Sequence, residues 1–423
     1  MPIPNTSNVD RALAWGYQAQ ISDGTTDLLL RLAVAPGREL SVTTAPLAAQ
    51  QINTAQTPEE FRAEFGQTYA RSDFTGGAGL DQAHQRNAAP NDFRRFFDSK
   101  GVDVFKNAGE KGDAYSLCLH KETEAIASQA STEAIQCMVE YEDIIALGRG
   151  NQVFITSDNF ATVTTYTNGV APNTVKDMAL DGSTLYVAFS DGTDSVVRQK
   201  DLADSSTFSS YATATGRVIE QIFAVKNIII SAEADGKLYE LAGAGTPTLI
   251  KDLPSGEKWA AVEDAGAVIL AASDGGYIYS IKEGSSGLEL AGQTYIENEE
   301  IVDVLESNGI IFFSTAESTS GGGKVGRLYR GVLSNDTNLY NVSNRQLIKE
   351  FGADDSTLDH SPEKFYATRD QVYFGVIDSA TETHLYSIYL PTLGYARDKY
   401  FVTSTAGKVL DIVIDLRKKS KTF

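Results

Sequence analysis

Histidine and cysteine, the residues most often found in metal and nucleophilic sites, are scarce in this sequence of 423 residues. The four histidines are His84, His120, His360 and His384, and the two cysteines are Cys118 and Cys137. No two histidines stand at the helical spacing of a zinc-binding motif, and two cysteines are too few for a disulfide framework. We therefore expect no metal and no cofactor, and we interpret both cysteines as reduced strand residues.

Glycine-rich segments are the second place where chemistry could lie. Residues 321–325 lack the hydroxyl residue and the earlier glycine of a phosphate-binding loop, and residues 76–79 lack the spacing of a dinucleotide-binding turn. Asp-Gly pairs recur, for example at 181–182 and 235–236. They are typical of hairpin turns. We do not interpret them as calcium loops, because a calcium loop needs several oxygen ligands at alternating positions.

Carboxylates are abundant, and a pair of them in a channel could act as acid and base in a glycosidase. Nothing marks which two of the 56 acidic residues would do so. No nucleophile elbow and no cysteine–histidine pair occurs in a supporting context. We predict no catalytic residue and a non-enzymatic function, with a carbohydrate-binding or carbohydrate-active propeller as an alternative.

The elements that must position any site follow a repeat over the last three quarters of the chain. A short apolar strand, a tight polar turn, a second apolar strand and a looser polar stretch recur about every ~40 residues, as at 178–189. This pattern is typical of the blades of a β-propeller. It predicts an all-β protein with blades near residues 134–170, 174–214, 217–252, 257–296, 300–350 and 363–403.

Two stretches of strand-like pattern remain outside these six ranges. Residues 408–416 match the strand that opens other blades, and residues 115–130 match outer strands that lack an opening one. Joining them would complete another blade and hide open sheet edges. We therefore expect a seven-bladed β-propeller over residues 106–423, with six blades and a separate C-terminal strand as the second choice.

Charge is distributed unevenly along the chain. The net charge is −20, and residues 1–100 hold 11 acidic against 9 basic residues, so most of the excess lies in the repeat region. An acidic surface repels phosphate backbones, so we expect no nucleic acid partner. No run approaches the ~20 apolar residues of a membrane span, and the start lacks the pattern of a secretory signal, so no membrane insertion is expected.

The first 105 residues do not share the repeat. Residues 28–34 could form one strand and residues 58–65 a short helix, but little regular structure is expected elsewhere, because glycine and polar residues dominate residues 69–90. Nine large aromatic residues nevertheless occur within residues 1–100. Aromatic side chains without a core of their own usually dock on another surface, so residues 1–105 are interpreted as an assembly arm.

The most unusual run of residues in this arm lies between 65 and 104. Residues 71–79 read Arg-Ser-Asp-Phe-Thr-Gly-Gly-Ala-Gly, and residues 96–104 read Phe-Phe-Asp-Ser-Lys-Gly-Val-Asp-Val. The two phrases resemble a segment of virion proteins of tailed bacteriophages that precedes a run of β-repeats, with Val102 in place of an isoleucine. The resemblance covers residues 65–104 alone and implies a structural protein of the tail, with no chemistry that could be transferred.

The residues of this segment suit an interface. Glycine permits close backbone approach, and aromatic and charged side chains are common anchors. The assembly interface is therefore predicted at Arg71, Asp73, Phe74, Gly76, Gly77, Gly79, Phe93, Phe96, Phe97 and Asp98. The same residues could instead cap the chain's own propeller, and both roles can hold together.

Together with the resemblance, these features predict a structural component of a phage virion, in the tail, tail tip or baseplate-fibre region, assembled in the host cytoplasm. The arm would attach it, and the propeller would be the displayed interaction surface. Expected partners are other virion proteins and copies of the chain, since virion parts follow closed symmetry. A host receptor or glycan is a further expected partner. A capsid decoration or head-fibre protein would share these features and is the first alternative.

Overall fold

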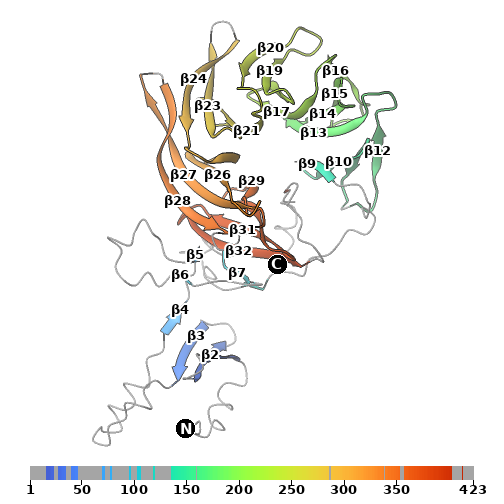
Figure 1. Cartoon of the computed structure of the whole chain (residues 1–423). Helices are drawn as coiled ribbons and strands as arrows, with labels where there is room; N and C mark the ends of the chain where they lie inside the picture. Colours follow the sequence, from blue (N-terminus) through green and yellow to red (C-terminus); the bar gives the residue numbers. More distant parts are fainter. Residues whose placement is uncertain are drawn as a thin grey trace, which may run out of the picture. The chain divides into compact units, whose positions relative to one another are not determined.

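Figure 1 shows the chain as a computed structural model built from β-sheets. It describes residues 135–158, 160–284, 287–337, 339–352, 357–402 and 412 and, before residue 135, eight short strands with residues 104–105. The chain divides into two compact units, one of residues 1–120 with 391–398 and one of residues 121–390 with 399–423. Among the described residues there is no helix long and apolar enough to span a bilayer.

Six four-stranded sheets, here called blades 1 to 6, account for the described strands after residue 134, and each pairs its strands in chain order. Blade 1 holds β9 (Ile135–Tyr141), β10 (Ile144–Arg149), β11 (Gln152–Thr156) and β12 (Thr164–Thr167). Blade 2 holds β13 (Thr174–Asp181), β14 (Thr184–Ser190), β15 (Ser195–Asp201) and β16 (Ser209–Ala214). Blade 3 holds β17 (Ile219–Val225), β18 (Ile228–Glu233), β19 (Lys237–Leu241) and β20 (Thr248–Asp252).

The other three blades repeat this plan. Blade 4 holds β21 (Trp259–Asp264), β22 (Ile269–Ser273), β23 (Tyr277–Gly284) and β24 (Gly287–Tyr295). Blade 5 holds β25 (Glu300–Ser307), β26 (Ile310–Ser318), β27 (Lys324–Asp336) and β28 (Leu339–Phe351). Blade 6 holds β29 (Glu363–Ala367), β30 (Gln371–Ser379), β31 (Glu382–Tyr389) and β32 (Gly394–Val402).

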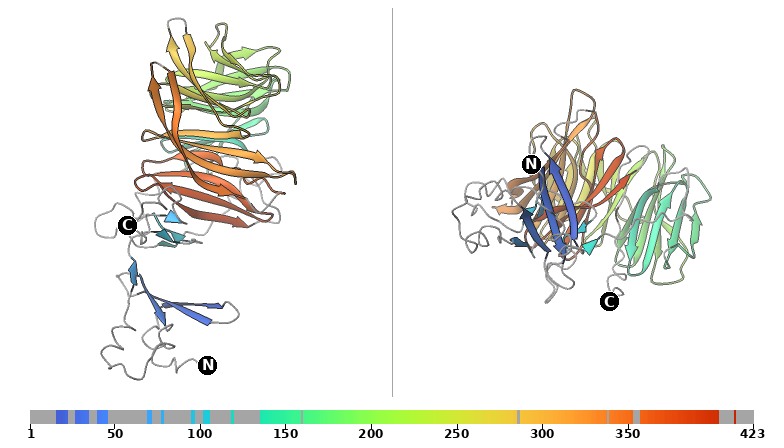
Figure 2. Two further views of the ribbon diagram at one scale, coloured as in Figure 1. Left: turned by 60° about the vertical axis from the view of Figure 1, so that its left-hand side comes forward. Right: turned by 90° about the horizontal axis from the view of Figure 1, so that it is seen from below.

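The blades are arranged as in a β-propeller. The first strand of each blade contacts the first strand of the next, from β9 through to β29. Figure 2 shows the sheets following one another face to face in chain order, from green through yellow to red. The fold is therefore an all-β propeller with six blades.

The apolar core lies between consecutive blades. Phe189 of blade 2 belongs to the same buried cluster as Val153 of blade 1, and Trp259 of blade 4 packs with Leu238 of blade 3 in another. The second strands of blades 2 and 4 are apolar and buried along most of their length. Successive side chains point to opposite faces, so Ala271 joins the cluster shared with blade 3 and Leu270 the cluster shared with blade 5. Each fully buried side chain of this size stabilises the fold by about 1.5–3 kcal/mol.

Every first strand carries a β-bulge near its start. One residue on this strand has no partner on the second strand, so two residues oppose one. The extra residues in blades 1 to 5 are Gln136, Lys176, Glu220, Ala260 and Val302. In blade 6 the bulge lies at Lys364 and Phe365, and Lys364 has a φ of 57°. A bulge repeated at one place in every described blade points to a shared role.

The blade count corrects the sequence expectation of seven. Each blade begins and ends within a few residues of one of the six expected ranges, but the described residues form no seventh blade. Within 115–130, Cys118 and Leu119 (β8) pair with Val102 and Asp103 (β7). This partner is near in sequence and has a shorter loop to close than the other end of the chain. Residues 408–416 lie outside the described residues, apart from Ile412.

The arm contains more regular structure than expected. An antiparallel sheet joins β1 (Gly16–Ser22), β2 (Asp27–Val34), β3 (Leu40–Ala45) and β4 (Tyr69–Arg71). The expected strand at 28–34 is β2, and the other three strands were missed because polar and small residues interrupt their apolar pattern. Beyond this sheet, β5 (Gly77–Ala78) pairs in parallel with β6 (Arg95–Phe96). The helix expected at 58–65 lies outside the described residues.

Candidate functional site

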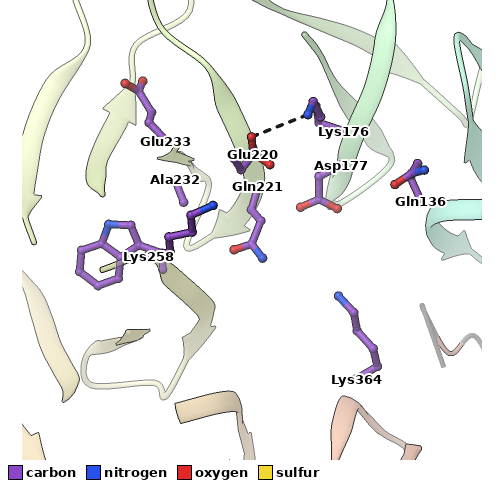
Figure 3. A pocket seen from close by; sticks show the side chains of 10 residues that line it. Gln136, Lys176, Asp177, Glu220, Gln221, Ala232, Glu233, Lys258 and Lys364 are labelled. Atoms are coloured by element: carbon purple, nitrogen blue, oxygen red, sulfur yellow. Dashed lines mark ion pairs between the residues drawn. The ribbon is translucent and has the colours of Figure 1, made fainter. Parts of the chain in front are cut away.

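The first strands of five blades border one cavity of about 320 Å³. This volume lies at the lower end of the range for small-molecule sites. Figure 3 shows the side chains that line it. They are Gln136 of blade 1, Lys176 and Asp177 of blade 2, Glu220, Gln221, Ala232 and Glu233 of blade 3, Lys258 and Trp259 at the start of blade 4, and Lys364 of blade 6.

The bulges explain why these side chains reach the cavity. In a regular strand, successive side chains point to opposite faces, whereas a bulge bends the strand and redirects the extra residue. Four of the bulge residues line the cavity, namely Gln136, Lys176, Glu220 and Lys364. The fold therefore presents one polar side chain from each of four blades to the same space.

The cavity wall carries balanced charge in a chain whose net charge is −20. Three lysines and three carboxylates line it. Lys176 Nζ lies 3.7 Å from Glu220 Oε1, and both side chains are partly exposed. An ion pair of this kind stabilises a protein by less than about 1 kcal/mol. The wall offers both hydrogen-bond donors and acceptors, so it can hold a small polar ligand.

A second set of side chains on the first strands links neighbouring blades. Asp177 Oδ2 accepts a hydrogen bond from the N–H of Ile222 at 3.0 Å, and Gln221 donates to the carbonyl of Ala260 at 3.4 Å. Asp303 Oδ2 accepts from the N–H of Phe365 at 2.8 Å. These bonds tie blade 2 to blade 3, blade 3 to blade 4 and blade 5 to blade 6.

Two carboxylates of the first strands, Glu263 of blade 4 and Asp303 of blade 5, repel each other electrostatically. Burial raises the pKa of Glu263 to about 8, and repulsion from Asp303 adds to this rise. Burial likewise raises the pKa of Asp303 to about 6. Glu263 accepts a hydrogen bond from the N–H of Glu306 at 3.4 Å, and Asp303 accepts two from backbone N–H groups. Both carboxyl groups thus bond to the backbone of first strands.

Glu233 and Trp259 are held within the cavity wall itself. Glu233 is 4% exposed and forms an ion pair with Arg217, whose guanidinium lies 3.9 Å from the ring centroid of Tyr239. Burial raises the pKa of Glu233 in spite of this partner. Trp259 is 5% exposed and donates its indole N–H to the carbonyl of Gly236 at 2.9 Å. The indole therefore serves packing rather than a ligand.

The predicted interface residues all belong to the arm segment of the sequence. Three of the ten fall on described strands: Arg71 on β4, Gly77 on β5 and Phe96 on β6. The pairing of β5 with β6 brings Gly77 next to Arg95 and Ala78 next to Phe96. The other predicted residues, Asp73, Phe74, Gly76, Gly79, Phe93, Phe97 and Asp98, lie outside the described residues.

Gly77 makes a close contact within the chain's first compact unit. Its φ is 78°, and a Cβ added there would lie 2.5 Å from the backbone nitrogen of Tyr395 and 2.6 Å from Cα of Gly394. Any other residue would be strained by its conformation and would collide with backbone atoms. This member of the predicted interface therefore packs against its own chain.

The histidines follow two different patterns. His360 is buried, and its Nδ1 lies 2.6 Å from the carbonyl oxygen of Ile377. His384 lies between two carboxylates, those of Asp378 and Glu382. Glu382 and His384 stand two residues apart on one strand, a spacing that differs from the helical spacing of zinc-binding motifs. His84 and His120 lie outside the described residues.

Comparisons with known proteins give similarities of fold. No protein-family model matches the chain, and no curated protein matches it. Among solved structures, the β-propeller domain of Cps50 (Swd1) from Myceliophteria thermophila aligns with 13% identity and a TM-score of 0.44, covering 64% of this chain and 90% of that one. YCF48 bound to a D1 peptide aligns with 12% identity and a TM-score of 0.42, over 63% and 82%. The computationally designed protein Ika8 aligns with 11% identity and a TM-score of 0.42, over 66% and 91%.

Proposed function

We propose that the chain is a structural component of a tailed-phage virion, in the tail, tail tip or baseplate-fibre region. Residues 1–105 form the arm that attaches it, and the propeller is a displayed interaction surface. The observation that carries this proposal is the run of residues 65–104, whose two phrases resemble a segment of such virion proteins.

The packing of Gly77 separates two roles among the residues of this run. Because Gly77 contacts Gly394 and Tyr395 of its own chain, it serves to fix the segment in place. The proposed contacts with neighbouring virion proteins then belong to the other nine predicted residues, above all to the aromatic ones, since large aromatic side chains contribute most to interface energies.

The outer strands of blades 3, 4 and 5 support the role of a displayed surface. Leu249, Leu290 and Leu347 are exposed, and each stands immediately beside a bulge in the pairing of the third and fourth strands. The strands that carry them, β20, β24 and β28, contact one another in turn. Exposed apolar side chains on neighbouring elements are a common feature of interaction sites.

Substitutions in the full chain test the arm. A phage that lacks the gene is complemented with the wild-type chain or with a variant carrying Phe74→Ala and Phe97→Ala, and the purified particles are probed for the protein. The variant should keep the wild-type melting temperature but be lost from particles. A matched control, the triple variant L249S, L290S and L347S, should still be incorporated.

Two outcomes would count against this proposal in different ways. If the Phe74→Ala and Phe97→Ala variant is incorporated normally, these aromatic residues do not form the attachment surface. If the wild-type protein is absent from purified particles, the virion role itself is wrong. The copy number per particle, measured by quantitative mass spectrometry, separates a tail component, present in few copies, from a capsid decoration protein, present in many.

A further inference from the structure

The β30–β31 hairpin of blade 6 carries three side chains of metal-ligand type at its end. Asp378, Glu382 and His384 each offer one ligand atom, and these atoms all lie within 4.8 Å of one another. Glu382 Oε2 is 3.1 Å from His384 Nε2, and Asp378 Oδ2 is 3.4 Å from His384 Nδ1. We propose that these three side chains bind one divalent transition-metal ion, with zinc as the best match.

The geometry of the hairpin brings the three residues together. Val376 pairs with His384 and Ser379 with Glu382, and Asp378 lies in a bulge between these pairs. Glu382 and His384 are two residues apart on one strand, so their side chains point to the same face. A bulge can redirect a side chain, which allows Asp378 to join them. The Ser379 Oγ accepts a hydrogen bond from the N–H of Glu382 at 3.1 Å, closing the turn.

Aromatic packing fixes the imidazole. His384 is 0% exposed, and its ring centroid lies 6.1 Å from that of Tyr386. Tyr386 in turn stacks on Phe374, with ring centroids 5.5 Å apart, and both rings meet Phe351 of blade 5 edge-on. The ligand on the buried side is therefore held by a packed wall, as a preorganised metal site requires.

The two carboxylates provide access and charge. The side chains of Asp378 and Glu382 are 37% and 27% exposed, so an ion can enter from the solvent. With a neutral imidazole the cluster carries two negative charges, in a chain whose net charge is already −20. A divalent cation neutralises both negative charges, whereas a proton on His384 would neutralise only one of them.

The ligand types decide which metal fits. Imidazole suits zinc and other transition metals, whereas calcium and magnesium favour sites made of oxygen atoms alone. Zinc bonds of about 2.0–2.2 Å place tetrahedral ligand atoms roughly 3.4 Å apart, close to the 3.1 Å between Glu382 Oε2 and His384 Nε2. A single ion takes one ring nitrogen, Nε2 beside Glu382. The partly exposed Asp378 side chain then turns to the same ion, and water fills the fourth position.

The test is a zinc titration of the full chain. The protein is stripped with a chelator, dialysed and titrated with zinc chloride in a calorimeter, with manganese and calcium chlorides as separate arms. The variants Asp378→Asn and Glu382→Gln keep the size of partly exposed side chains and should fold. The wild type should bind one equivalent of zinc more tightly than calcium, and each variant should weaken zinc by about 100-fold or more. Asp191→Asn, in an exposed hairpin turn, is the control and should bind zinc as the wild type does.

Three results would overturn the proposal. The wild type could fail to bind zinc, which would show that the cluster is not a zinc site. Zinc binding could survive unchanged in both carboxylate variants, which would place it elsewhere in the chain. Calcium could bind more tightly than zinc, which an imidazole ligand does not explain. A third variant, His384→Gln, should abolish zinc binding, and if it does not fold, the two carboxylate variants still decide the question.

Discussion

The carboxylates of the first strands and those of the β30–β31 hairpin have different partners. Asp177 and Asp303 accept hydrogen bonds from backbone N–H groups of the next blade, at 3.0 and 2.8 Å. Asp378 and Glu382 instead lie on the two sides of one imidazole. A backbone N–H is a fixed partner that can only donate, whereas an imidazole is itself a metal ligand. The first set therefore joins blades, and the second set is suited to an ion.

Two neighbouring residues on one strand, Lys176 and Asp177, differ in their partners in the same way. At the bulge of blade 2, Lys176 faces Glu220 across the cavity wall, while Asp177, the next residue, bonds to Ile222 of blade 3. One residue is available to a ligand, and the next holds the blades together. Lys176 can thus vary without removing the hydrogen bond from Ile222 to Asp177 that joins blades 2 and 3.

The largest effect is expected where a blade link is removed. Asp303→Ala leaves the N–H groups of Phe365 and Val304 without their acceptor, each of which lies 2.8 Å from a carboxylate oxygen. Hydrogen bonds to a charged group contribute about 1.5–3 kcal/mol each, and loss of the buried charge offsets part of this. The free energy of unfolding should fall by about 3 kcal/mol, as measured by urea denaturation. A loss below about 1 kcal/mol would mean that Asp303 does not link blades 5 and 6.

Zinc should stabilise the protein by a comparable amount if the hairpin cluster binds it. At a free concentration of 100 times the dissociation constant, a ligand that binds the folded state alone adds about 2.7 kcal/mol to the free energy of unfolding. Denaturation with and without zinc should show this gain in the wild type and not in Asp378→Asn. An equal gain in both proteins would show that zinc acts at another place, and that the comparison between the two carboxylate sets fails.

The pH dependence of stability should depend on Glu263. Burial raises its pKa in the folded chain to about 8, from an ordinary value of 4.5, so the folded state binds this proton more tightly than the unfolded state. Protonated Glu263 therefore adds to the free energy of unfolding at low pH. As the pH rises from about 4.5 to 8, this free energy should fall by roughly 2 kcal/mol for a half-buried group. Glu263→Gln should flatten this slope. An unchanged slope in Glu263→Gln would contradict the assignment.

The strand pattern of the propeller could be predicted from the sequence because its signals are local. Short apolar strands separated by tight polar turns mark each blade within a few residues. The blade count could not be predicted in the same way, since it depends on where the chain ends pair. Cys118 and Leu119 resemble outer blade strands, yet they pair with Val102 and Asp103 close by in sequence. Pattern alone does not decide between a near partner and a distant one.

The residues of the two candidate sites were missed for a different reason. Those at the cavity stand at bulges, and a bulge is a property of strand pairing rather than of one strand. One sequence signal exists: two polar residues follow an apolar one at Val175-Lys176-Asp177 and at Ile219-Glu220-Gln221, which breaks the alternation. For His384, counting back by two along the strand and across the preceding turn would have found Glu382 and Asp378.

The smallest effect, expected at the bulge of blade 2, tests the comparison within one strand. Lys176→Met removes a partly exposed ion pair whose atoms are 3.7 Å apart, so the free energy of unfolding should change by no more than about 0.5 kcal/mol. Asp177→Ala removes the acceptor of the Ile222 N–H and should cost about 1.5 kcal/mol or more. Urea denaturation of both variants, under the same conditions, gives the difference. If Lys176→Met destabilises as much as Asp177→Ala, the bulge residues also support the fold, and the cavity is a structural feature rather than a surface that is open to a ligand.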